Sequence, residues 1–169
     1  MPRWRFEYES RNVPLLDLHV QAQGRPVAVL TGTLDSGATD TMLSIKAAEK
    51  LGLTLTDLRP SHPVTIADNS DVPSWITHVP IRAQVQIHLP DTHDLVPWGP
   101  LFDLHPVFME TGSPLWGQED FCASFKVNLE RYSLPAHFVL EYWAGMSDGV
   151  PRPSSRDTTR TYSHHTSTL

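Results

Sequence analysis

The sequence predicts an all-β fold. Short stretches in which apolar and polar residues alternate recur along the 169-residue chain, and fifteen prolines interrupt the windows in which a long helix could form. Apolar residues make up 40% of the chain and include five tryptophans, enough for one sizeable core. We expect an N-terminal arm over 1–12, one folded domain over 13–144 and a disordered polar tail over 145–169. The tail has almost no apolar residues, so burial cannot offset the entropy that it would lose on ordering.

The first elements are predicted to be strands. Trp4, Phe6 and Tyr8 alternate with charged neighbours, which indicates a strand with one apolar face in the arm. Residues 16–22 alternate in the same way, and a turn at 24–26 leads into 27–34, so the two segments form a hairpin. Residues 27–34 are apolar or β-branched on both faces, which predicts a strand buried on both sides.

A turn and a short helix follow this strand. Asp35-Ser36-Gly37-Ala38 forms the turn, because Gly37 permits a tight path, and the chain resumes as a second short strand through Ser44. Ser44 is expected to cap a helix that Gly52 ends. A carboxylate at the end of a buried strand is costly unless it is hydrogen-bonded or used, so Asp35 is the leading candidate for chemistry.

A long hairpin is predicted in the middle of the chain. Its first arm is 64–67 and its tip is 68–71, residues that favour turns. Its second arm is the clearest period-2 segment of the chain, 79–89, with one face that must pack on a core. Beyond it we expect a loop over 90–100, one buried strand over 102–109, a short helix after Gly117, and two strands over 126–130 and 137–143.

Charge and composition exclude several classes of function. The net charge is −6 with scattered Lys and Arg, so there is no basic patch for nucleic acid. No apolar segment approaches a membrane span, and the first residues lack the apolar core of a signal peptide, so a cytoplasmic location is the default. The single cysteine, Cys122, fits a reducing compartment and is interpreted as core packing.

Three groups of residues resemble the landmarks of a known family. Asp35-Ser36-Gly37-Ala38 after an apolar strand, with Thr41-Met42-Leu43 beyond it, resembles the active-site loop of the retropepsin-like aspartic proteases. Leu115-Trp116-Gly117 resembles the family's second landmark, two apolar residues and a glycine that open a short helix. The 64–70 segment resembles the flap hairpin, whose expected substrate-binding residues are Ala67, Asp68, Asn69, Ser70 and Trp75.

The resemblance implies a fold and an activity. The fold would be a closed or partly open acid-protease barrel with a flap hairpin and one or two short helices. The activity would be that of a homodimeric endopeptidase acting on extended peptides, without a cofactor or metal. A water molecule can be activated by two carboxylates that share one proton. The chain carries one Asp-Ser-Gly, so the second Asp35 must come from another copy related by a two-fold axis.

Some positions depart from the family pattern. Thr39 and Gln118 are uncharged where many viral members have an ion pair, and losing both partners leaves no unpaired charge. Trp116 replaces a smaller aliphatic residue, and the flap tip lacks glycines. Trp75 is a candidate pocket wall, although simple packing is the slightly favoured interpretation.

Two alternatives remain open. One is a retropepsin-like module that dimerises or binds peptides without cleaving them. The other is a metal-dependent hydrolase that uses the cluster of His88, Asp91, His93 and Asp94, residue types that can bind a divalent ion.

Overall fold

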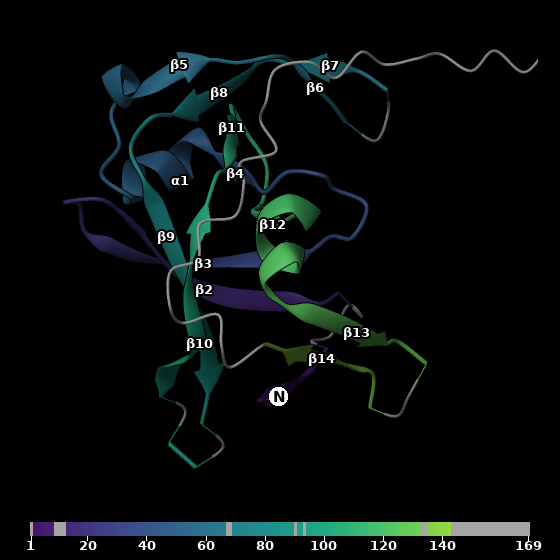
Figure 1. Cartoon of the computed structure of the whole chain (residues 1–169). Coiled ribbons are helices and arrows are strands. Elements are labelled where there is room, and N and C mark those ends of the chain that lie inside the picture. The colour runs from purple at the N-terminus through teal and green to yellow at the C-terminus, as the bar shows by residue number, and fades with distance from the viewer. Residues whose placement is uncertain are drawn as a thin grey trace, which may run out of the picture.

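The protein is a mostly β structure with three short helical segments in the part of the chain described here. The computed structural model describes residues 2–8, 13–66, 69–89, 91–92, 94–132 and 135–142. Its strands form a nine-stranded, a three-stranded and a two-stranded sheet (Figure 1). The helical segments are α1 (Ile45–Lys50), η1 (Leu55–Asp57) and η2 (Gln118–Cys122). The predicted all-β class is confirmed.

The nine-stranded sheet contains the predicted hairpin at its centre. In spatial order its strands are β10 (Leu95–Leu104), β9 (Ile81–His88), β2 (Leu15–Ala22), β3 (Val27–Leu34), β12 (Leu115–Trp116), β4 (Met42–Ser44), β11 (Val107–Met109), β8 (Ser74–Thr77) and β5 (Leu58–Pro60). The hairpin of β2 and β3 places Leu18 opposite Leu30, and both side chains are buried. Leu16, Leu18, Val20 and Ala22 supply one buried face of β2, as their alternation predicted.

The prediction that residues 27–34 are buried on both faces is wrong. Val27 is 52% exposed and Val29 43%, whereas Leu30 and Leu34 on the opposite face are buried. Only one face of β3 packs on the core, so the strand needs apolar residues only at alternate positions. The outward valines still suit a strand because β-branched side chains favour extended backbone.

The helix after β4 forms as predicted. The Ser44 hydroxyl accepts a hydrogen bond from the Ala47 N–H (3.1 Å), so Ser44 caps α1. Gly52 then adopts a positive φ of 71°, the left-handed conformation that ends many helices. The connection expected after Gly52 is more ordered than predicted, because it holds η1 and β5.

The flap-like hairpin has its predicted tip but a different second arm. β6 (Val64–Thr65) pairs with β7 (Asp71–Val72), and Asn69 at the tip has φ 62°. Ala67 and Asp68 lie outside the described residues. The predicted arm over 79–89 is wrong, because the strand within it, β9, pairs with β2 and β10. There its apolar residues Ile81, Ala83, Val85 and Ile87 are buried in the core.

The segment from 90 to 109 also differs from the prediction. β10 begins at Leu95, so the expected loop over 90–100 is too long, and the expected strand over 102–109 divides into β10 and β11 around His105-Pro106. β10 is at the edge of the sheet, the position at which strands tolerate proline, and it contains Pro97 and Pro100.

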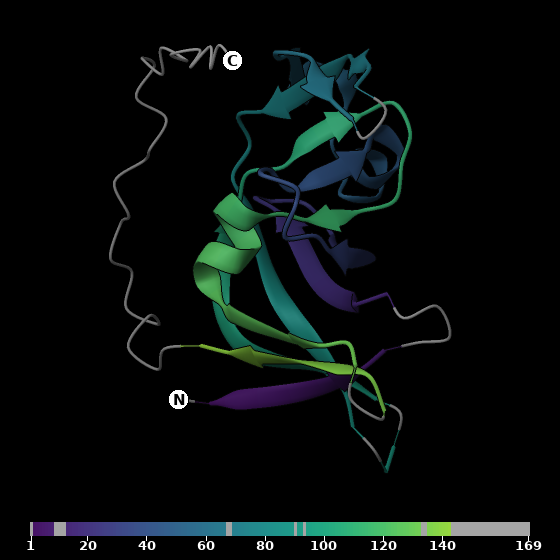
Figure 2. The same cartoon turned by 90° about the vertical axis from the view of Figure 1, so that its right-hand side faces the viewer.

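The three-stranded sheet joins the two ends of the described chain. β14 (His137–Glu141) lies between β1 (Arg3–Glu7) and β13 (Lys126–Glu130) (Figure 2). Phe138 of β14 is fully buried and stacks on Phe6 with ring centroids 4.9 Å apart. The predicted strands 126–130 and 137–143 are therefore present, although Trp143 and the tail lie outside the described residues. The three parts proposed for the chain, 1–12, 13–144 and 145–169, stay a prediction.

No helix in the described ranges has the length and apolar character needed to cross a membrane.

Candidate active site

Asp35 lies where three strands of the large sheet meet. β3 ends one residue before Asp35, and β4 begins a few residues after it. β12 lies between them, parallel to β3 with Trp116 opposite Leu34, and antiparallel to β4 with Leu115 opposite Met42. The turn that carries Asp35 is therefore bounded on both sides by strands that a third strand holds together.

The backbone of the turn fixes the Asp35 carboxylate. The Gly37 N–H donates to Asp35 Oδ1 (2.8 Å), and the Asp35 N–H donates to the Trp116 carbonyl (3.1 Å). The Ala38 N–H closes the turn on the Asp35 carbonyl (3.2 Å). Asp35 is only partly buried, so its carboxylate is oriented by the protein and still open to a neighbour or to water.

Gly117 allows the second landmark to approach this turn closely. A Cβ at Gly117 would lie 2.3 Å from the carbonyl carbon of Asp40, a distance that no side chain can occupy. The Gly117 N–H donates to the hydroxyl of Thr41 (3.2 Å), which is fully buried. The sequence indicated Gly117 as a landmark but not the role of Thr41, which depends on a contact 76 residues apart.

Thr39 and Gln118 are uncharged where many viral family members have an ion pair, and here hydrogen bonds join the two landmarks at these positions. The Gln118 side chain donates to the Ser36 carbonyl, and the Gln118 N–H donates to the Ala38 carbonyl (2.9 Å). The Glu119 N–H donates to the carbonyl of Thr39 (2.9 Å). The loop is thus held by neutral hydrogen bonds, without an ion pair between residues 39 and 118.

Trp116 is accommodated by a glycine that sequence reasoning missed. The indole is fully buried and its Nε1–H donates to the Leu16 carbonyl (3.0 Å). A Cβ at Gly32 would lie 2.6 Å from this ring. A glycine inside a strand often marks such an approach, and this signal was present in the sequence.

Cys122 borders the site as a partly buried thiol. It packs against the core, as predicted, and burial raises its pKa, with a smaller contribution from the negative charge of Asp35. Raising the pKa keeps the thiol protonated, which disfavours a nucleophilic role. An open hollow of about 480 Å³ lies beside Cys122 and is lined by Ser36, Gln118, Cys122, Ala123, Phe125, Lys126 and Val127.

A second hollow contains none of the predicted site residues. It measures about 290 Å³ and is lined by residues from 76–81 and 103–106.

The described flap residues do not lie on the strands that bound the Asp35 turn. Asn69 and Ser70 form the tip of the two-stranded sheet, where the Asn69 N–H donates to the Ile66 carbonyl (2.9 Å). Trp75 lies on β8 opposite Phe108 and packs against the core. Their contact with a substrate stays a prediction.

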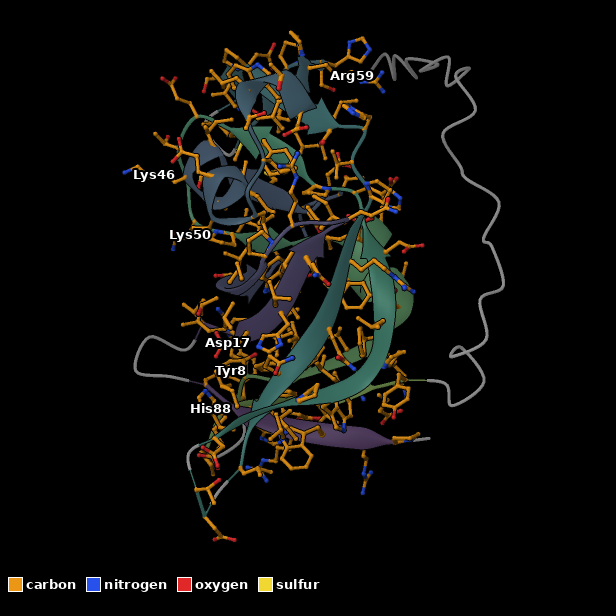
Figure 3. The ribbon with its side chains drawn as sticks, turned by 90° about the vertical axis from the view of Figure 1, so that its left-hand side faces the viewer. Tyr8, Asp17, Lys46, Lys50, Arg59 and His88 are labelled. Carbon is orange, nitrogen blue, oxygen red and sulfur yellow. The ribbon has the colours of Figure 1, made fainter. Side chains whose placement is uncertain are left out.

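The cluster of the metal-dependent alternative is only partly described. His88 pairs with Asp17 of the neighbouring strand (3.4 Å), and Figure 3 labels both residues. His93 lies outside the described residues, and no group of three His, Cys, Asp or Glu suited to a metal occurs within the described ranges.

Comparison with known proteins identifies a fold and a family model. Residues 18–88, which include Asp35, match the family model described as aspartyl protease. A retropepsin-like aspartic protease from Rickettsia conorii aligns with TM-score 0.55 and 16% identity, over 83% of this chain and 91% of that chain. EIAV protease complexed with the inhibitor HBY-793 aligns with TM-score 0.42 and 12% identity, over 68% of this chain and 89% of that chain. No curated protein sequence matches the chain.

Proposed function

Since this chain has the fold of the retropepsin-like aspartic proteases, we propose that it is an aspartic endopeptidase that acts as a homodimer. Each subunit supplies one Asp35, and the two carboxylates together activate the water that hydrolyses a peptide bond. The observation that carries the proposal is the position of Asp35: it directly follows β3, its carboxylate accepts a hydrogen bond from the Gly37 N–H, and it stays partly exposed.

The proposed chemistry depends on two carboxylates with different protonation. Two like charges about 3 Å apart cannot both be ionised near neutral pH, so the pair holds one proton. The ionised carboxylate takes a proton from the water, while the protonated one donates to the carbonyl oxygen of the scissile bond. Because the sequence contains one Asp-Ser-Gly, a pair of Asp35 carboxylates requires two chains, related by a two-fold axis between their Asp35 turns.

The proposed substrate is an extended peptide. The hairpin of β6 and β7 is the candidate flap, and its tip includes Asn69 and Ser70. Main-chain hydrogen bonds to such a hairpin would hold a peptide with little dependence on its sequence. The neighbouring strand β8 carries Trp75, the candidate wall of a side-chain pocket.

The test is hydrolysis of a peptide library by the wild-type chain and by Asp35→Asn. The variant keeps the shape of the side chain and removes the ionisable group, so we expect hydrolysis to fall by about 10²- to 10⁴-fold or more while the fold remains. Wild-type activity should peak on the acid side of neutrality, because one carboxyl must be protonated.

Three results would contradict the proposal. Hydrolysis by Asp35→Asn at the wild-type rate would exclude an aspartic mechanism. Loss of wild-type activity on adding a chelator would favour the metal-dependent alternative. A folded wild-type dimer that cleaves no peptide at any pH would favour the module without catalysis.

A further inference from the structure

Asp120 is a buried carboxylate for which the proposed chemistry has no role. Its side chain is 8% exposed, and among the described residues it is the only charged side chain that is buried. Burying a charge is costly unless hydrogen bonds compensate for it. Here Asp120 Oδ2 accepts the backbone N–H of His105 (3.0 Å), and Asp120 Oδ1 lies 3.1 Å from His105 Nδ1. A carboxylate only accepts hydrogen bonds, so Nδ1 is the donor, and both oxygens are bound to one residue.

The pair joins η2 to the corner between β10 and β11. Asp120 lies on η2, where the N–H groups of Gln118 and Glu119 donate to carbonyls of the loop that begins at Asp35. His105 lies in the short connection between β10 and β11. The Asp120 carboxylate therefore gives η2 a second attachment, outside the loop that carries Asp35.

The corner at His105 is also bonded to the loop that carries Asp35. The Val107 N–H donates to the Thr41 carbonyl (2.9 Å), and β11 pairs in parallel with β4. The Thr41 hydroxyl in turn accepts the Gly117 N–H (3.2 Å). Three segments are thus each hydrogen-bonded to the other two, and they form a closed network: residues 38–41, 105–107 and 117–120. In a closed network each segment is held by two others, so removing one side leaves the rest less fixed.

We propose that His105 and Asp120 are positioning residues of the proposed active site, because their two hydrogen bonds close this network and fix the direction of the Asp35 carboxylate. The inference rests on the proposed function, since it is the reaction at Asp35 that requires a fixed direction. Both side chains act through η2 and the backbone of the loop. Catalysis is sensitive to such placement, because an error of about 1 Å can cost about 10²-fold in rate.

A neighbouring ion pair provides the matched control. Asp103, two residues before His105, pairs with Arg82 (3.5 Å), and both side chains are mostly exposed. This pair joins β9 and β10, which the strand ladder already holds together at the same two residues. Exposed ion pairs contribute little, so Asp103→Asn should leave the network unchanged.

Two substitutions at His105 separate the hydrogen bond from the volume of the ring. His105→Asn keeps an N–H donor close to the position of Nδ1, whereas His105→Leu has no donor. The His105 side chain is 63% exposed, so neither change leaves a buried cavity. We expect kcat for peptide hydrolysis to fall by about tenfold or more in His105→Leu with KM nearly unchanged, because substrate still binds while Asp35 is misdirected. His105→Asn should restore kcat, and Asp103→Asn should match wild type.

The Gly37 amide proton tests the positioning without catalysis. It donates to Asp35 Oδ1 (2.8 Å), so its NMR chemical shift reports whether the carboxylate keeps its direction. In His105→Leu this proton should move upfield, as an amide does when its hydrogen bond weakens. It should stay at its wild-type position in His105→Asn and Asp103→Asn. Unchanged amide shifts in the hairpin of β2 and β3 would show that the rest of the fold is intact.

A milder variant covers the case in which His105→Leu does not fold. His105→Gln carries its amide one bond farther from the backbone, so the donor is present but displaced. It should show the same changes in the Gly37 amide and in kcat at a smaller size.

The outcomes separate this inference from the proposed function. A Gly37 amide and a kcat that stay at wild-type values in folded His105→Leu would overturn the positioning role and leave the protease activity standing. An equal loss of kcat in His105→Asn and His105→Leu would also overturn it, because the hydrogen bond would not be the cause. A chain that cleaves no peptide while its Gly37 amide moves in His105→Leu would support the positioning role and contradict the proposed function.

Discussion

At the scale of single residues, the site depends on backbone geometry more than on charged partners. The Asp35 carboxylate accepts a hydrogen bond from the Gly37 N–H, and the Asp35 N–H donates to the Trp116 carbonyl. Gly117 lets the second landmark come close enough for these bonds, since any Cβ there would meet the Asp40 carbonyl. An isolated turn could not hold a carboxylate in one direction, whereas three paired strands can.

Cys122 offers a measurement of the charge on Asp35. Its pKa is raised above the usual value of a cysteine, chiefly through burial and secondarily through the negative charge of Asp35. The thiolate is the reactive form, so the pH midpoint for alkylation by iodoacetamide should be higher in the folded chain than in the denatured chain. In Asp35→Asn the midpoint should fall part of the way, because burial remains.

The control for this experiment is a carboxylate elsewhere in the fold. Asp57, in the short helix η1, does not contribute to the Cys122 shift, so Asp57→Asn should leave the alkylation midpoint unchanged. An equal midpoint in Asp35→Asn and wild type would show that the Asp35 charge does not reach the thiol.

At the scale of elements, the Trp116 side chain of β12 makes one tight contact with β3, in addition to the pairing of the two strands. The Trp116 indole occupies the space above Gly32, and a Cβ at Gly32 would lie 2.6 Å from the ring. Gly32→Ala should therefore lower the free energy of unfolding by about 1–3 kcal/mol, the usual cost of overpacking a core. Urea denaturation measures this change.

A double-mutant cycle identifies the source of that cost. Trp116→Leu alone leaves a cavity and removes the donor to the Leu16 carbonyl, so it should also destabilise the chain. Combined with Gly32→Ala, it makes room for the new methyl group. The double variant should therefore lose less free energy of unfolding than the two single variants together, by about 0.5–3 kcal/mol. Strictly additive effects would mean that the two residues do not compete for the same space.

Local elements were predictable from the sequence, and long-range pairings were not. The hairpin of β2 and β3, the Ser44 cap and the strands β13 and β14 follow from patterns contained within a few residues. The insertion of β12 between β3 and β4 joins segments about eighty residues apart, and no local pattern encodes it. The period-2 pattern of β9 was visible, but its partners were not, which is why 79–89 was assigned to the wrong hairpin.

The candidate site could be predicted to a similar extent. Asp35 could be found because a carboxylate at a strand end stands out against apolar neighbours, and Gly117 because it opens a helix. The roles of Gly32 and Thr41 depend on contacts with residues 116 and 117, which only the folded chain brings together. The exposure of Val27 and Val29 depends on which layers cover the sheet, which composition does not specify.

At the scale of the whole molecule, the three-stranded sheet should distinguish two truncations. Deleting 137–169 removes β14, so β1 and β13 lose their shared partner, and the core loses Phe138 and Leu140, which are both fully buried. This variant should be insoluble or unfolded. Deleting only 147–169 removes a polar segment and leaves β14 complete, so solubility and melting temperature should match wild type. Unfolding of the shorter truncation would show that the core extends into the tail.

A shared active site also predicts how activity depends on the composition of a mixture. If each site needs one Asp35 from each of two chains, then wild-type activity should fall on dilution below the dimer dissociation constant. At a fixed total concentration that keeps the chains dimeric, replacing part of the wild type with Asp35→Asn gives mixed dimers that hold a single ionisable Asp35. Because these are inactive, peptide hydrolysis should fall as the square of the wild-type fraction. A site complete within one chain would instead give a linear decrease and no loss on dilution, which would exclude the shared pair.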